Sequence, residues 1–125
     1  MSQRDRQIIL GAFIPSAGIM GSAWRHPTAG SDSFRDFEHY RWIADKLEAA
    51  RFHALFFNDS VNVDLDPLAL ARGPNSVRWD PLVLLPALAL VTRHIGLIAT
   101  ASSTYNEPYN IARKFANIDH LSGGR

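Results

Sequence analysis

Three short apolar runs recur along the chain, and each is followed by a loop and then by a helical pattern. The runs cover residues 8–14, 54–57 and 95–99. Runs of this length that are apolar at successive positions are typical of strands buried on both faces, as in a parallel sheet. Because periodicity alone does not separate such runs from buried helix, the residues that flank them decide.

The stretch between the first two runs favours a helix. Ser33 and Asp36 have the spacing of a capping box, with aspartate in place of the usual Glu or Gln. Apolar residues then recur at helical spacing, with charged residues on the other faces. The apolar positions are Phe37, Tyr40, Ile43, Ala44 and Leu47.

A second helix is predicted between the second and third runs. Asp80 followed by Pro81 indicates an N-cap and a first helical position. The pattern continues to about Thr92 and is apolar nearly all round, so we expect this helix to be buried on most sides. Pro86 lies inside it, and we expect this proline to kink the helix or delay its start.

A third helix is predicted after the last run. It opens at residues 106–108 and ends at Ser122, where Gly123 and Gly124 suit a left-handed C-cap. Its expected inward positions are Ile111, Ala112, Phe115, Ile118 and Leu121.

The alternation of strands and helices predicts an α/β protein with a parallel sheet and right-handed crossovers. Three parallel strands cannot close a barrel, and the chain stops where a further strand is due. We therefore expect residues 1–125 to form a single incomplete domain, the first part of a larger repeating β/α protein. Two long connections, residues 15–33 and 59–80, rise from the carboxyl ends of strands, where α/β proteins bind ligands.

Composition narrows the class of protein. With 13 Lys and Arg against 12 Asp and Glu, the net charge is +1, which argues against a nucleic-acid-binding surface. No apolar run reaches the roughly 18–20 residues that span a bilayer, and the N-terminus has no secretory apolar region. The chain has no Cys, which excludes disulfide and thiolate chemistry. We expect a soluble cytoplasmic protein.

Metal ligation and nucleophilic catalysis find little support. The histidines show no paired ligand spacing, and we expect structural roles for four of them, at positions 39, 53, 94 and 120. There is no Gly-x-Ser-x-Gly elbow and no glycine-rich phosphate-binding signature. We assign no metal site and no catalytic residue.

The first long connection contains Trp24, Arg25 and His26. An aromatic ring, a cation and an imidazole on a loop at a strand end can line a pocket. The sequence supports equally well a loop that is merely anchored by packing of Trp24.

Polar residues follow two of the strands. Asp59 closes the second strand, and Thr100, Ser103 and Thr104 follow the third. Taken alone, such residues are usually turn formers or helix approaches. Because the carboxyl ends of adjacent parallel strands meet at one edge, they favour a site that hydrogen-bonds the polar edge of a bound ring. Spacing alone does not name the ligand.

At these residues the chain resembles a known family. The matching stretches are residues 23–26, 56–59, 92–97, 99–113 and 119–125. In order and spacing they resemble the N-terminal part of the bacterial luciferase-like flavin-dependent monooxygenases. Within that superfamily the resemblance is greatest to the nitrilotriacetate monooxygenase component A and dibenzothiophene-sulfone monooxygenase type.

This resemblance implies a (β/α)8 barrel, of which the chain would supply three βα units. It implies an enzyme, a homo-oligomer when complete, that uses reduced FMN from a separate flavin reductase to activate O2 and oxygenate a small substrate. By position, Asp59 and Thr100 match FMN contacts, with Ser103 and Thr104 as neighbours. The resemblance also places residues 24–26 on the wall of the substrate pocket. Asn58 departs from the family, where a hydrophobic or small residue is more familiar.

Two other interpretations stay open. One is a luciferase-like oxidoreductase that uses a different flavin, such as a deazaflavin. The other is a truncated, non-catalytic chain that binds a flavin or a partner. We expect the 125 residues alone to be inactive.

Overall fold

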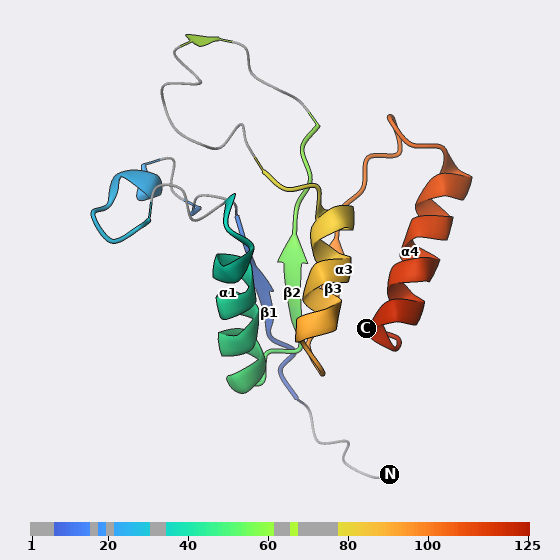
Figure 1. Ribbon diagram of the computed structural model, residues 1–125, viewed down its shortest axis with the longest axis horizontal. Coiled ribbons are helices and arrows are strands. Elements are labelled where there is room, and N and C mark those ends of the chain that lie inside the picture. Colours follow the sequence, from blue (N-terminus) through green and yellow to red (C-terminus); the bar gives the residue numbers. More distant parts are fainter. Residues whose placement is uncertain (1–6, 16–17, 20–21, 31–34, 62–65, 68–77) are drawn as a thin grey trace.

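The computed structural model describes residues 7–15, 18–19, 22–30, 35–61, 66–67 and 78–125. Strands β1 (Gly11–Phe13), β2 (Ala54–Phe57) and β3 (Gly96–Ala99) form one parallel sheet in sequential order. Figure 1 shows a helix after each strand, so the expected β-α-β-α-β-α order is confirmed.

The helices are α1 (Phe37–Ala49), α3 (Pro81–Val91) and α4 (Pro108–Ser122), with a short 3₁₀ helix, η1 (Ala23–Arg25), in the first connection. Helices α1 and α3 lie in front of the sheet in Figure 1, and α4 packs against α3. In the part of the chain that the structure describes, no helix has the length and apolarity needed to cross a membrane.

β1 covers Gly11–Phe13, whereas the sequence predicts a strand over residues 8–14. Before Gly11 the regular ladder with β2 is replaced by contacts between Leu10 and His53. The carbonyl of Leu10 accepts from the His53 N–H (2.9 Å), while the Leu10 N–H donates to His53 Nδ1 (3.1 Å). A side chain thus takes the place of a ladder partner here, and His53 has the structural role expected of it. β3 likewise begins one residue late, at Gly96, where an added Cβ would lie 3.0 Å from the His53 carbonyl oxygen.

Helix α1 begins later than its predicted capping box. Asp36 is the N-cap, and its carboxylate accepts from the Glu38 N–H at 3.0 Å. In the predicted capping box Ser33 would be the N-cap and Asp36 the third helical residue; that place for Asp36 is wrong, and Ser33 lies outside the described residues. The predicted inward face is confirmed, with Tyr40 and Ala44 buried and the other three positions half-buried.

Helix α3 begins as predicted, with Asp80 accepting from the Leu82 N–H at 2.8 Å. It continues through Pro86, so the proline does not delay its start. Burial on most sides was expected, but Val83 is 59% exposed and Leu90 is 77% exposed. The described elements cover α3 on the sides that face the sheet and α4, and they leave this side open.

Helix α4 ends at Gly123, whose φ of 72° gives the predicted left-handed C-cap. Ile118 is buried and Ile111 and Phe115 are half-buried, as expected. The inward placement of Ala112 and Leu121 is wrong, because both are exposed. The buried and half-buried side of α4 is formed by positions 111, 115, 118 and 122. Ala112 and Leu121 are each next to one of these positions in the sequence and therefore project to a different side of the helix.

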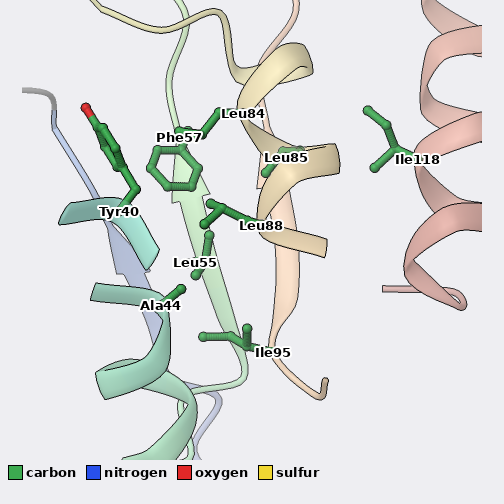
Figure 2. Close-up of a cluster of buried hydrophobic side chains, with 9 residues drawn as sticks. All are labelled: Tyr40, Ala44, Leu55, Phe57, Leu84, Leu85, Leu88, Ile95 and Ile118. Atoms are coloured by element: carbon green, nitrogen blue, oxygen red, sulfur yellow. The ribbon is translucent and has the colours of Figure 1, made fainter. Parts of the chain in front are cut away.

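The hydrophobic core lies between one face of the sheet and helices α1 and α3 (Figure 2). Leu55 and Phe57 of β2 point into it, and the Phe57 ring meets the Tyr40 ring edge-on with centroids 5.9 Å apart. Leu84 and Leu88 of α3 close it from the other side. Because side chains alternate along a strand, Phe56 belongs to the opposite face of the sheet.

Candidate functional site

The predicted polar residues at the ends of β2 and β3 are in contact. The Asp59 N–H donates to Thr100 Oγ at 2.7 Å. The Thr100 N–H donates to the Phe57 carbonyl at 3.1 Å and so continues the parallel ladder one residue beyond β3. Asp59 and Thr100 are thereby held together at the carboxyl edge of the sheet.

This pair keeps hydrogen-bonding capacity for a ligand. The Thr100 hydroxyl accepts from Asp59 and can still donate its own hydrogen. The Asp59 carboxylate makes no hydrogen bond or ion pair with any residue in the described ranges. One donor and one anionic acceptor are therefore available at neighbouring positions.

An apolar row lies on the sheet face opposite α1 and α3. Phe13, Phe56 and Ile98 are in register across the three strands. The rings of Phe13 and Phe56 are in contact, with centroids 5.3 Å apart. Phe13 is 44% exposed and Ile98 is 49% exposed, so the described elements leave this face open. Thr100 follows Ile98 by two residues, which by strand alternation places it on the same face.

Sequence reasoning did not single out this apolar row. Its signal is the period of two within each run, which places Phe13, Phe56 and Ile98 on one face and Leu55, Leu97 and Ala99 on the other. Because both faces of the sheet carry apolar residues, the apolar and polar pattern of the sequence does not distinguish one face from the other.

Ser103 and Thr104 lie in the connection between β3 and α4, and both are exposed. Neither makes a hydrogen bond with a described residue. The connection is held instead by its neighbour Asn106, whose amide donates to the Ser102 carbonyl at 3.0 Å. A flavin contact by Ser103 or Thr104 stays a prediction.

The segment of Trp24, Arg25 and His26 is not brought to the Asp59–Thr100 pair. Figure 1 shows η1 beyond β1, on the side of the sheet away from β3. The Arg25 guanidinium lies over the Trp24 ring, 5.0 Å from its centroid, and His26 Nδ1 lies 2.9 Å from the Thr28 hydroxyl. These contacts are local, and a role in a substrate pocket stays a prediction.

A hollow opens on the side of the sheet that faces α1 and α3, at the carboxyl ends of β1 and β2. Burial raises the pKa of Tyr40, whose side chain forms part of its wall. The residues that line this strand-end hollow are Ile14, Tyr40, Phe57, Asn58, Arg78, Trp79 and Leu84.

No metal centre emerges from the described ranges, where no three His, Asp or Glu side chains are grouped so as to hold an ion. Among the histidines for which a structural role is expected, His39 lies in α1, His120 lies in α4, and His94 lies two residues before β3.

Comparison with known proteins shows that most of the chain matches one protein family. Residues 18–125 match the family model described as luciferase-like monooxygenase. The chain is 43% identical to N-acetyl-S-(2-succino)cysteine monooxygenase of Bacillus subtilis, over all of this chain and 27% of that protein. It is 36% identical to nitrilotriacetate monooxygenase component A of Aminobacter aminovorans, over 97% of this chain and 28% of that protein.

The fold has close counterparts among solved structures. A crystal structure of riboflavin lyase with modified FMN and substrate riboflavin matches with a TM-score of 0.85 and 31% identity, covering 96% of this chain and 28% of the other. The expected family and the expected three βα units of a luciferase-like (β/α)8 barrel are confirmed. The chain spans little more than a quarter of the length of the curated relatives described above.

Proposed function

The chain belongs to the luciferase-like monooxygenase family, and from this premise we propose that the complete protein is an FMNH2-dependent monooxygenase acting on a small organic substrate. Residues 1–125 are then part of one larger barrel domain and contribute one wall of its flavin site. The observation that carries the proposal is the 2.7 Å hydrogen bond that joins Asp59 to Thr100 at the carboxyl edge of the sheet.

The residues at this edge fit a flavin. A flavin ring has two apolar faces and one polar edge that both donates and accepts hydrogen bonds. Phe13, Phe56 and Ile98 offer an open apolar surface, and the Thr100 hydroxyl and the Asp59 carboxylate offer a donor and an acceptor beside it. The riboflavin lyase structure, which contains modified FMN, supports a flavin among the ligands of this fold.

Reduced FMN, when bound, supplies the electrons with which O2 is activated. The contribution of this chain is to bind and orient the ring. Hydrogen bonds from Thr100 and to Asp59 fix the polar edge, and the apolar row excludes water from one face of the ring. None of these side chains is assigned a proton-transfer role.

Separate delivery of the reduced flavin is part of the proposal. We expect a flavin reductase as partner, and the name of the Aminobacter relative, component A, supports a system of more than one protein. The predicted homo-oligomer is supported by the exposed apolar residues Val83 and Leu90 on α3. The cytoplasmic location stays a prediction.

The test is an anaerobic titration of the complete protein with reduced FMN, reduced FAD and a reduced deazaflavin. Tightest binding of reduced FMN supports the proposal, and tightest binding of the deazaflavin would favour the alternative oxidoreductase. The FMN complex is then mixed with O2 in the presence of candidate substrates. Substrate oxygenation supports a monooxygenase, whereas flavin binding without any oxygenated product would favour the non-catalytic alternative.

A further inference from the structure

Asn58 lies opposite Thr100 in the register of the sheet. At the start of β3 the N–H of Gly96 donates, at 2.8 Å, to the carbonyl of the residue that precedes its register partner in β2. Thr100 repeats this geometry, because its N–H donates to the Phe57 carbonyl at 3.1 Å and Phe57 directly precedes Asn58. The register of β2 and β3 therefore continues by one pair, in which Asn58 is the partner of Thr100.

This pairing decides the face of the sheet to which the Asn58 side chain belongs. Side chains alternate along a strand, so Asn58 shares the face of Phe56, two residues earlier, and Thr100 shares the same face with Ile98. Neighbouring strands lie about 4.8 Å apart, so the carboxamide and the hydroxyl are neighbours at the end of the apolar row. The strand-end hollow reaches Asn58 from the other face, at the end of the strand.

The Asn58 side chain has hydrogen-bonding capacity that the protein leaves unused. It is half-buried, and it has no hydrogen-bond partner in the part of the chain that the structure describes. A carboxamide carries two N–H donors and one carbonyl acceptor. A partly desolvated amide gains stability when a ligand supplies the missing partners. Asn58 thus adds a combined donor and acceptor to the acceptor of Asp59 and the donor of Thr100.

A carboxamide complements one part of a flavin in particular. The polar edge of the ring presents the N3–H between two carbonyl oxygens. An amide side chain can bind an N–H and the carbonyl beside it through two parallel hydrogen bonds, as Asn does on the edge of adenine. A carboxylate only accepts, so in the same place it would set one of its oxygens against the ring carbonyl oxygen. A hydroxyl supplies a single donor, which suits the second carbonyl.

We propose that Asn58 recognises the N3–H of the flavin and one adjacent carbonyl through paired hydrogen bonds, and that Thr100 donates to the other carbonyl. The Asp59 carboxylate then accepts from a different N–H of the reduced ring. This inference rests on the proposed function. It adds to it the residue that selects an unsubstituted N3 and thereby sets the orientation of the ring.

The experiment compares reduced FMN with reduced 3-methyl-FMN, in which a methyl group replaces the N3 hydrogen, by anaerobic titration of the complete protein. We expect the parent to bind the methylated flavin about tenfold more weakly, because both paired hydrogen bonds are lost. Asn58→Leu keeps the volume of the side chain and removes the same bonds. Its affinity for reduced FMN should fall by about tenfold, while its affinity for 3-methyl-FMN changes by less than about twofold.

Three controls separate recognition of N3 from a structural effect. Asn58→Gln keeps the carboxamide on a longer stem and should retain part of the preference for FMN. Asp59→Ala should weaken binding of both flavins by the same factor, because its carboxylate does not meet N3. Asn117→Ala, at an exposed position of α4, should bind both flavins as the parent does. The comparison of the two flavins in the parent needs no variant, so it tests the pairing even where Asn58→Leu fails to fold.

The outcomes separate this inference from the proposed function. Equal affinity of the parent for the two flavins overturns the role of Asn58, while binding of reduced FMN still supports the flavin site. A preference for FMN that survives Asn58→Leu also overturns it, and loss of that preference in Asp59→Ala would assign the N3–H to Asp59. Failure of the parent to bind reduced FMN at all overturns the proposed function together with this inference.

Discussion

The backbone N–H of Asp59 is bonded to the side-chain oxygen of Thr100, 2.7 Å away, and this contact joins the ends of two strands. The two residues are separated by 41 positions in the sequence. The bond fixes the threonine rotamer, because the hydroxyl oxygen must face Asp59. The direction left for the hydroxyl hydrogen is thereby restricted, which prepares the group to donate to a ligand at the edge of the sheet.

Thr100→Val removes this hydroxyl at nearly constant volume. The Asp59 N–H loses its acceptor and the ligand loses a donor, so we expect reduced-FMN affinity of the complete protein to fall by about 1 kcal/mol, or about fivefold. Thr100→Ser keeps the hydroxyl and should retain most of the affinity. Anaerobic titration measures both, and a valine variant that binds as tightly as the parent would contradict the role of Thr100.

Asp59→Ala tests the carboxylate. A hydrogen bond to a charged group is lost, and we expect reduced-FMN affinity to fall by about 1–3 kcal/mol. Asp45→Ala is the matched control, because Asp45 is an exposed acid on α1. If flavin affinity is the same in both variants, Asp59 is not a flavin ligand.

The co-location of Asp59 and Thr100 could be predicted from the sequence because it follows from topology. Sequential parallel strands have their carboxyl ends at one edge, so residues that follow neighbouring strands must meet. The apolar row of Phe13, Phe56 and Ile98 was missed because both faces of the sheet are apolar. The strand-end hollow was missed because its lining residues, among them Tyr40 of α1 and Arg78 before α3, come from separate segments of the chain.

Other features have no local signal in the sequence. Leu121 looks like an inward residue because it is apolar, yet it is 58% exposed, since burial depends on which surface lies opposite. Glu48 bonds to residues 93–95, which lie 45–47 positions further along the chain. A helix pattern shows that Glu48 is polar, but it does not show what the carboxylate meets.

Arg51 offers a test of backbone strain. It follows α1 with a φ of 60°, in the left-handed region, where a side chain is unfavourable and glycine is not. We expect Arg51→Gly to raise the free energy of unfolding of the complete protein by about 0.5–1 kcal/mol, because the relief of strain exceeds the added freedom of the unfolded chain. Arg41→Gly, inside α1, should lower it by about 1 kcal/mol. Urea unfolding measures both changes, and a fall in stability with Arg51→Gly would contradict the argument.

Glu48 anchors the turn before β3. One of its carboxylate oxygens accepts from three successive backbone N–H groups, those of Arg93, His94 and Ile95, at 2.9, 2.6 and 3.0 Å. Glu48→Ala leaves these groups without an acceptor, and we expect the free energy of unfolding to fall by about 1–3 kcal/mol. Amide exchange should quicken at His94 and Ile95 while staying unchanged at the core of β2. Unaltered exchange at both residues would show that water replaces the carboxylate without loss.

The pKa of Glu48 predicts how the free energy of unfolding depends on pH. Burial alone would raise the pKa of Glu48, but the hydrogen bonds from residues 93–95 and the charge of His94 outweigh it and hold the pKa below its ordinary value of 4.5. A carboxyl group whose pKa is lower in the folded state stabilises the fold fully above its unfolded pKa, and this stabilisation is lost as pH falls through the folded value. The difference in unfolding free energy between the parent and Glu48→Gln should therefore be constant at neutral pH and shrink below pH 4.5. Urea unfolding at pH 7, 5 and about 3.5 measures this difference. A difference that stays constant, or grows, on acidification would show that the charge of Glu48 does not support the turn.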